Sequence, residues 1–276
     1  MSLIINTNMA SIAAQNNLTI SSNKLQDSVE RLSSGLRIVK AADDAAGLAL
    51  SEKMRAKIRA SAVALRNAND GVSMLQTAEG ALNEVSSILV RMRELATQAA
   101  SPSLGASERA TINDEFVRLK SEIDRIAQVT EFNGQVLVNG ALSSSSLAFQ
   151  VGIGATANDT IAATVCGATT AALSVDTQIV TAAAEAKTAL QAVESAIGIA
   201  AGIRGTIGAN QSRLFSAISN LRVSEQNLQA AESRIRDADF SYETAMFTKN
   251  QIMVQAGTAI LGQANLMPQA ALQLLK

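Results

Sequence analysis

The spacing of the apolar residues constrains the fold of this chain more than any other feature. Steps of three and four residues alternate between apolar positions, which places them along one side of an α-helix. The pattern holds over residues 18–39, 75–99, 112–126 and 214–235. The sequence therefore predicts a mainly α-helical protein, with long helices toward both ends of the chain.

Aromatic residues are scarce, and this favours long helices over a thick globular core. Hydrophobic residues make up 47% of the chain, but aromatic residues make up only 3%. Because large rings usually dominate cores and ligand pockets, we expect helices packed by Ala and Leu. Ordering residues 18–39 would cost roughly 1–2 kcal/mol each, whereas each buried apolar side chain returns at most about 1.5–3 kcal/mol. This segment therefore needs partner helices, from its own chain or from neighbouring molecules.

Helix-breaking and helix-capping residues mark the boundaries in the first half. Gly35 loosens the first helix, and Asp43 and Asp44 suit the start of the next. We expect that second helix to be continuous to about residue 100, because Pro102 stops it. Ser107 is the expected cap of a third helix.

In the second half, the helical pattern resumes near Gln178, breaks at 237–240 and continues to the last residue. Asp237 and Asp239 lie at that break. Paired acids can indicate acid–base chemistry, but this pair and the earlier one both lie where a helix is expected to begin. Capping is the better explanation.

The middle of the chain differs in composition and predicts a small β insert. Turn-forming Asn-Gly pairs occur at 133–134 and 139–140, and short β-prone pieces lie at 147–151 and 160–165, which indicates hairpins. Gly152 and its neighbours resemble a phosphate-binding loop only superficially, so a turn is expected there. We therefore predict five segments: 1–43, an N-terminal helical assembly segment; 44–140 and 178–236, the two halves of a helical rod domain; 141–177, a short β-hairpin insert; and 237–276, a C-terminal assembly segment.

The residue types argue against catalysis and against several classes of partner. The chain has no His and a single Cys, Cys166, which removes the commonest general base and most zinc sites. No nucleophile–base pair is apparent, so we expect no enzyme activity, no cofactor and no metal. The net charge of −1 disfavours nucleic acid, and no apolar run is long enough to span a membrane. No secretory signal pattern begins the chain.

Several motifs together resemble one family. RLSSGLRI at 31–38 and AADDAAGLA at 41–49 are similar to the N-terminal signature of bacterial flagellins. The match continues through RELATQA at 93–99 and EIDR at 122–125, and closes at the other end with SRIRDAD at 233–239 and QANLMPQ at 263–269. The resemblance covers about residues 1–140 and 178–276.

The resemblance implies an antiparallel bundle of helices from both chain ends, whose terminal helices form coiled-coil-like inner tubes on assembly. It also implies a function: a structural subunit that polymerises with itself into the extracellular flagellar filament for motility. The alternatives are a hook-filament junction protein and a type III secretion tip or filament component. The implied partners are an export chaperone, the flagellar type III export apparatus, hook-filament junction proteins, the filament cap and a host Toll-like receptor.

Three sets of residues are candidate sites. By motif alignment, Arg91, Leu95 and Glu115 match the positions that the receptor contacts in flagellins that it senses; the alternative is that they serve only the rod. O-linked glycosylation by family analogy would fall on Ser143, Ser144, Ser145 and Ser146, which could equally form a flexible turn. The expected polymerisation core comprises Leu18, Leu25, Val29, Leu32, Leu36, Leu261, Leu266, Leu272 and Leu275.

Overall fold

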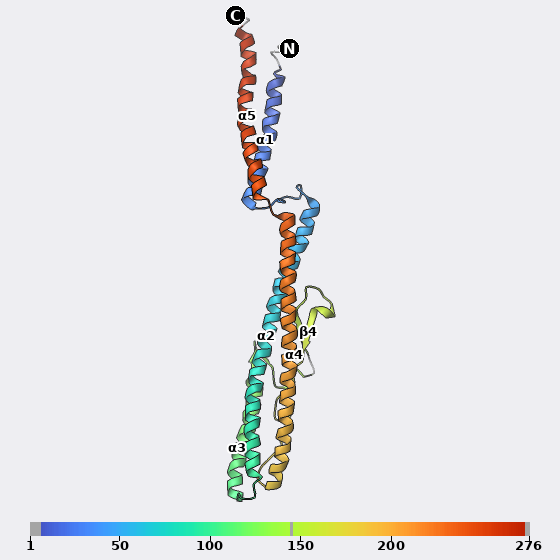
Figure 1. Ribbon diagram of the computed structural model, residues 1–276, viewed down its shortest axis with the longest axis vertical. Coiled ribbons are helices and arrows are strands. Elements are labelled where there is room, and N and C mark those ends of the chain that lie inside the picture. The colour runs from blue at the N-terminus through green and yellow to red at the C-terminus, as the bar shows by residue number, and fades with distance from the viewer. Residues whose placement is uncertain (1–6, 144–145, 274–276) are drawn as a thin grey trace. The chain divides into compact units, whose positions relative to one another are not determined.

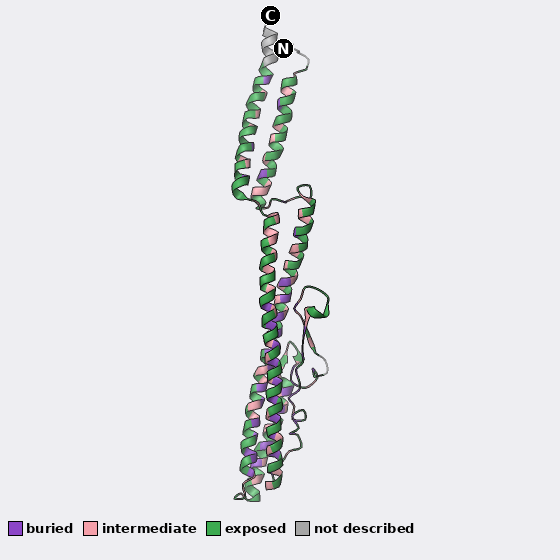
Figure 2. Ribbon diagram, turned by 45° about the vertical axis from the view of Figure 1, so that its right-hand side comes forward, coloured by how far each residue is buried: buried purple, intermediate pink, exposed green. Residues whose placement is uncertain are grey.

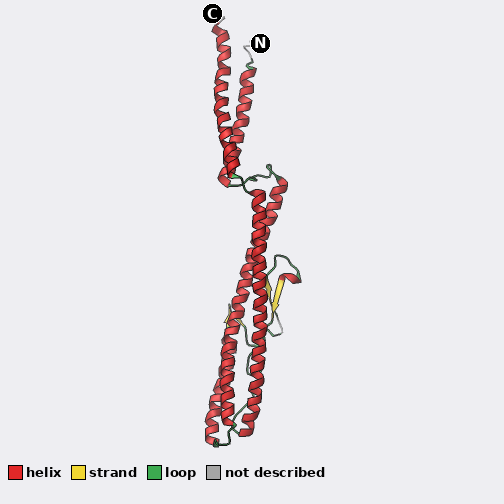
Figure 3. Cartoon of the chain, viewed as in Figure 1, coloured by secondary structure: helices red, strands yellow, loops and turns green. Residues whose placement is uncertain are grey.

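The computed structural model describes residues 7–143 and 146–273, with side chains placed through residue 266. Its five α-helices are α1 (Met9–Ser34), α2 (Ala45–Ala99), α3 (Ala106–Val129), α4 (Ala183–Arg236) and α5 (Phe240–Gln273) (Figure 1). The mainly helical prediction is thus confirmed. Strands occur only between α3 and α4 in the described residues: β1 (Glu131–Phe132), β2 (Gln135–Val136), β3 (Leu147–Gln150) and β4 (Thr160–Ala163), with the short 3₁₀ helix η1 (Ala157–Asp159) before β4 (Figure 3).

The chain forms two compact units. The terminal unit comprises residues 1–56 and 227–276, and the central unit comprises residues 57–226. The predicted division into five segments is not tested by this partition and stays a prediction.

In the terminal unit, α1 and α5 lie side by side and run antiparallel (Figures 1 and 2). The Asn8 side chain caps α1 by accepting a hydrogen bond from the Ser11 amide at 3.1 Å. The helix ends at Gly35, whose φ of 70° is left-handed and favours glycine. The helical spacing predicted through residue 39 was therefore wrong beyond Ser34: Leu36 instead forms a β-bridge with Asp237.

The central unit holds the main hydrophobic core. Residues of α2, α3 and α4 and of the segment between α3 and α4 pack together in one cluster, where buried positions concentrate (Figure 2). Among the twelve largest fully buried side chains in the described residues, only Ile38 lies outside this unit. The apolar spacing that predicted α2 and α3 therefore identified core positions, such as Leu82 and Phe116.

The predicted caps are partly correct. Asp44 caps α2, because its Oδ1 accepts a hydrogen bond from the Gly47 amide at 2.8 Å. Asp43 instead accepts from the Val39 and Lys40 amides of the preceding loop. Ser107 was the wrong cap for α3: the helix begins after Gly105, in extended backbone with no side-chain cap, and Ser107 lies inside it.

The two acids at the break between α4 and α5 also have different roles. Asp239 caps α5, since its Oδ1 accepts from the Ser241 amide at 2.9 Å and from the Tyr242 amide at 3.1 Å. Asp237 lies in the β-bridge with Leu36 and caps nothing that the structure shows. Capping therefore explains only one acid of this pair.

Two antiparallel hairpins follow α3. Asn133 and Gly134 both have positive φ, 51° and 77°, which is the turn expected between β1 and β2. Strands β3 and β4 pair over four positions, including Phe149 with Ile161. The Asn139-Gly140 turn joins no strand pair in the described residues, so that part of the hairpin prediction was wrong.

Helix α4 begins at Ala183, five residues after the predicted start at Gln178. Side chains of α3 explain the delay. Lys120 Nζ donates to the carbonyl oxygens of Asp176 and Gln178 at 2.9 and 2.8 Å. Asn113 Oδ1 accepts from the Val180 amide at 3.1 Å. These backbone groups therefore bond to α3 instead of to a helical turn of their own.

Candidate assembly surface

Residues of α5 at seven-residue intervals line its contact with α1, and they are small or polar. The set is Glu243, Asn250, Gly257 and Ala264. Gly257 lies closest to α1: an added Cβ would be 3.1 Å from Leu18 Cδ1 and 3.7 Å from Leu18 Cβ. Small residues at this interval let the two backbones approach closely.

Side-chain hydrogen bonds fix the alignment of the two helices near the start of α1. Asn8 Nδ2 donates to the Ala264 carbonyl oxygen at 2.8 Å, and Ser11 Oγ donates to Asn265 Oδ1 at 2.8 Å. Closer to the end of α1, Asn250 Nδ2 donates to Ser28 Oγ at 3.4 Å. α1 and α5 are therefore aligned along most of the length of α1.

The expected polymerisation residues fall into different environments. Leu18, Leu25, Leu32 and Leu261 are half-buried, and the first three share one face of α1 at seven-residue intervals. Val29 and Leu266 are exposed. Leu36 follows the end of α1, the side chain of Leu272 is not placed, and Leu275 lies outside the described residues.

Large apolar side chains remain exposed on both helices. Ile20 is 52% exposed on α1, and Ile252 and Ile260 are 58% and 59% exposed on α5. Others in the same class are Met9, Ile12, Val29, Phe240, Tyr242, Met253 and Leu266. The contact between α1 and α5 thus buries only part of the apolar surface of either helix.

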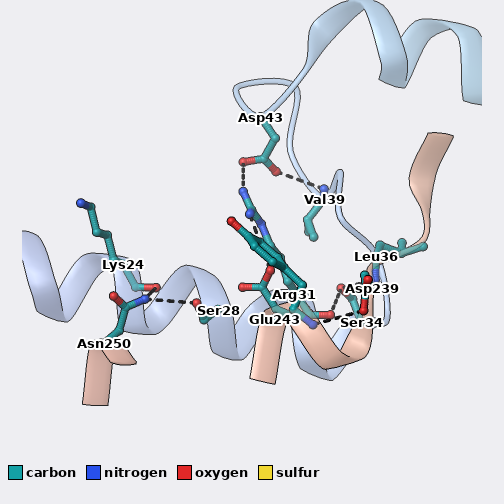
Figure 4. Close-up of polar contacts among 11 residues, drawn as sticks. Lys24, Ser28, Arg31, Ser34, Leu36, Val39, Asp43, Asp239, Glu243 and Asn250 are labelled. Atoms are coloured by element: carbon teal, nitrogen blue, oxygen red, sulfur yellow. Dashed lines mark hydrogen bonds and ion pairs between the residues drawn. The ribbon is translucent and has the colours of Figure 1, made fainter. Parts of the chain in front are cut away.

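An arginine at the end of α1 joins two acids from other elements. Arg31 lies 3.5 Å from Asp43 in the loop before α2 and 3.9 Å from Glu243 in the first turn of α5 (Figure 4). Glu243 is buried, at 6% exposure. Hydrogen bonds from the Lys40 and Val39 amides, together with Arg31, lower the pKa of Asp43 below its ordinary value.

The two connections of the terminal unit are bonded to each other. The Arg37 amide donates to the Arg236 carbonyl oxygen at 2.7 Å, and the Ala238 amide donates to the Gly35 carbonyl oxygen at 2.9 Å. Arg236 also forms an ion pair with Glu52 at 2.8 Å. The segments that lead out of α1 and into α5 are therefore held together at this point.

In the central unit, an exposed charged cluster spans α2 and α3. Arg91 donates through Nε and Nη2 to Glu115 at 3.0 and 2.9 Å, and through Nη1 to Glu94 at 2.9 Å. The hydrogen bonds to Glu115 and then to Glu94 raise the pKa of Arg91. All three side chains are about half exposed or more.

The other predicted receptor contact and the serine run are placed differently. Leu95 is 2% exposed and belongs to the core, so its side chain packs inside the chain and offers no surface to an outside partner. Ser143 and Ser146 are exposed, whereas Ser144 and Ser145 lie outside the described residues. Glycosylation of this run stays a prediction.

Neither a metal site nor a membrane-spanning helix is present in the part of the chain that the structure describes. No group of three or more His, Cys, Asp or Glu residues there could hold an ion. None of the described helices is apolar enough over a sufficient length to cross a bilayer.

Comparison with known proteins identifies the family from both ends of the chain. The model of the bacterial flagellin N-terminal helical region matches residues 5–143, and that of the C-terminal helical region matches residues 190–275. Flagellin of Halalkalibacterium halodurans is 44% identical over 99% of this chain and 100% of its own length. Flagellin of Bacillus subtilis is 43% identical over 99% of both chains.

Solved structures agree with the fold. The crystal structure of Bacillus cereus flagellin, at 30% identity, matches with a TM-score of 0.51 and covers 56% of this chain and 88% of that one. A putative flagellar hook-associated protein from Vibrio parahaemolyticus matches with a TM-score of 0.60 at 16% identity, over 71% of this chain and 100% of that one, which shows a shared fold alone.

Long helices that leave large apolar side chains exposed are typical of a structural protein. The chain belongs to the bacterial flagellin family. It is a structural subunit of the flagellar filament and not an enzyme, and the alternatives of a junction protein or a secretion tip component are not favoured.

Proposed function

We propose that this subunit polymerises through its terminal unit, with α1 and α5 packing against the same helices of neighbouring copies. The observation that carries the proposal is the incomplete burial of this helix pair. Neither α1 nor α5 contributes any of the twelve largest fully buried side chains in the described residues. Large apolar side chains such as Ile20, Ile252 and Ile260 are instead more than half exposed.

The free energy available from burying this surface is of the same order as the roughly 4–15 kcal/mol that association costs. Fully burying an aliphatic side chain contributes about 1.5–3 kcal/mol, so burying the exposed half of one contributes roughly 1 kcal/mol. Ten large apolar side chains, two of them aromatic, are exposed on α1 and α5 in the described chain. Because each subunit in a helical polymer has several neighbours, this surface can be covered from more than one side.

Replacing Ile260 with Asp tests the proposal. Ile260 is 59% exposed, so the charge should leave folding of the free subunit nearly unchanged. In the filament it would be an unpaired charge in an apolar contact. We expect the critical concentration for polymerisation, measured by sedimentation, to rise by about tenfold or more. The control is Ile260→Leu, which keeps the apolar surface and should polymerise normally. Normal assembly of Ile260→Asp would refute the proposal.

The polymerisation core then has two parts. Leu18, Leu25, Leu32 and Leu261 hold α1 and α5 together within one subunit, and Val29 and Leu266 face neighbours. We further propose export through the flagellar type III apparatus with a dedicated chaperone, attachment through hook-filament junction proteins and growth beneath a cap, so that the chain acts outside the cell. Family membership supports these partners, and co-purification of the chain with each of them tests them individually.

A second proposed interaction is recognition by a host Toll-like receptor through Arg91 and Glu115. Their exposure and mutual hydrogen bonds favour it, because a charged pair preset in one geometry costs little entropy on binding. Arg91→Ala should reduce receptor activation by the monomer, while unfolding by urea changes little, since exposed ion pairs contribute little to stability. Arg125→Ala is the matched control, because Arg125 forms a similar exposed ion pair with Glu122. Unchanged signalling by Arg91→Ala would remove this surface from consideration.

A further inference from the structure

The face between α1 and α5 buries polar side chains where apolar ones would pack more favourably. Asn250 is 6% exposed and Ser28 is 4% exposed. The Asn250 amide donates to the Ser28 hydroxyl and to the Lys24 carbonyl oxygen, both at 3.4 Å (Figure 4). A buried Asn at such a position of a helix pair lowers stability relative to an apolar residue, but it specifies how the helices align.

The apolar residues of this face do not distinguish one alignment from the next. Leu18, Leu25 and Leu32 recur every seven residues on α1, and Val254 and Leu261 are spaced in the same way on α5. A relative shift of seven residues therefore replaces one leucine by another. Contacts that do not recur at this interval must select the alignment.

The two possible seven-residue shifts of α5 along α1 give Asn250 different neighbours. A shift toward the end of α1 would replace Lys24 and Ser28 by Arg31 and Gly35, neither of which has a side-chain acceptor for the Asn250 amide. The opposite shift would place it near Ser21, which carries a hydroxyl like that of Ser28. Asn250 thus excludes the first shift and not the second.

We propose that the Asn250–Ser28 contact helps to determine the register of the terminal helix pair, together with the hydrogen bonds of Asn8 and Ser11 and the backbone bonds between residues 35–37 and 236–238. The Asn250–Ser28 contact opposes sliding of α5 toward the end of α1, and so helps to fix which residues the pair presents to neighbouring subunits. The functional consequence of this inference rests on the proposed assembly role of α1 and α5. The experiment below measures the alignment of the two helices and does not depend on that role.

Engineered cysteine pairs report the alignment directly. A Cβ at position 257 lies 3.7 Å from Leu18 Cβ, within the range of about 3.5–4.5 Å found in disulfides. Leu18→Cys with Gly257→Cys therefore reports the observed alignment. Leu25→Cys with Gly257→Cys reports the shift that Asn250 excludes, and Ser11→Cys with Gly257→Cys reports the opposite shift. All pairs are made in full-length chain carrying Cys166→Ser, so that no other thiol competes.

Each pair is combined with Asn250→Leu and Ser28→Ala, which replace the polar contact by apolar groups. Filaments, and free subunits in parallel, are oxidised and the products are resolved by non-reducing electrophoresis. With Asn250 and Ser28 present, we expect disulfide only in the 18/257 pair. With both replaced, the 25/257 product should increase severalfold above background, while 11/257 increases much less.

Two further variants test whether the substitutions merely loosen the packing of α1 against α5. Gln251→Leu adds the same apolar side chain at an exposed position and should leave the 25/257 yield at background. Exchanging the residues, as Asn250→Ser with Ser28→Asn, keeps an amide and a hydroxyl together and should restore the 18/257 product alone. A 25/257 yield that stays at background without the polar contact, or an equal increase in both shifted pairs, would overturn the inference. Those results would leave the assembly role intact, since the Ile260→Asp variant tests that role separately.

Discussion

Gly71 of α2 lies directly beneath the ring of Phe149 on β3, so that a Cβ added at position 71 would be 2.9 Å from Phe149 Cδ1. The β3–β4 hairpin therefore packs on α2 at a position where only glycine fits without a shift of the ring. Gly71→Ala should displace the hairpin and destabilise the central unit. Overpacking typically costs about 1–3 kcal/mol, whereas alanine gains about 0.8–1 kcal/mol of helix propensity. We expect a net loss of roughly 1 kcal/mol in the free energy of unfolding by urea.

Gly198 of α4 provides the matched control. It is also helical, but a Cβ there would meet nothing within 4 Å. Gly198→Ala should therefore stabilise the chain by about 0.8–1 kcal/mol through propensity alone. If the two substitutions changed stability in the same direction, the proposed packing of Phe149 on Gly71 would be wrong.

A carboxylate of α3 holds Thr170, in the segment that leads to α4. Asp124 accepts from the Thr170 amide and from the Thr170 hydroxyl, both at 2.8 Å, and Thr170 is buried. Asp124→Ala would leave both donors without this partner, and we expect a loss of about 1–3 kcal/mol in urea unfolding. Thr170→Val removes the hydroxyl and keeps the amide contact, so its cost should be smaller. Equal costs would show that the backbone contact is unimportant.

The loop between β3 and β4 should loosen in acid. Hydrogen bonds from the side chain and then the amide of Thr156 lower the pKa of Asp159 below its ordinary value, which is about 3.9. Because the folded pKa is the lower one, the charged carboxylate stabilises the folded loop. That contribution is complete above the ordinary pKa and is lost as the pH falls through the folded value.

NMR of the Thr156 amide between about pH 5 and pH 2 measures this change. We expect a chemical shift change centred below pH 3.9, together with broadening of neighbouring loop signals as the hydrogen bonds weaken. Asp159→Asn retains an acceptor but does not titrate, so its loop signals should be nearly independent of pH. The same acid transition in Asp159→Asn would assign the change to another group.

Much of the helical architecture could be predicted from local sequence. The three-and-four spacing located α2 and α3 because their apolar faces, including Leu82 and Phe116, pack in the central core. Gly35 marked the end of α1, but the apolar spacing continued past it to Leu36 and Val39. A left-handed glycine ends a helix whatever residues follow it.

The remaining differences depend on contacts that are distant in sequence. The late start of α4 follows from hydrogen bonds of Lys120 and Asn113, which are more than fifty residues away from their acceptor and donor groups. Leu95 matches a receptor-contact position by motif, yet its position on α2 directs its side chain into the hydrophobic core. Apolar spacing does not indicate the contact face of α5, because its residues are small or polar. The signal that does indicate it is the seven-residue recurrence of Glu243, Asn250, Gly257 and Ala264.

Hydrogen exchange of one chain, compared between the free subunit and the filament, tests the central claim most directly. If neighbours complete the packing of the terminal unit, amides of α1 and α5 should exchange rapidly in the free subunit and become strongly protected on polymerisation. Core amides of the central unit, such as those around Leu82 and Phe116, should be protected in both states. Equal protection of α1 and α5 in subunit and filament would contradict assembly through this helix pair.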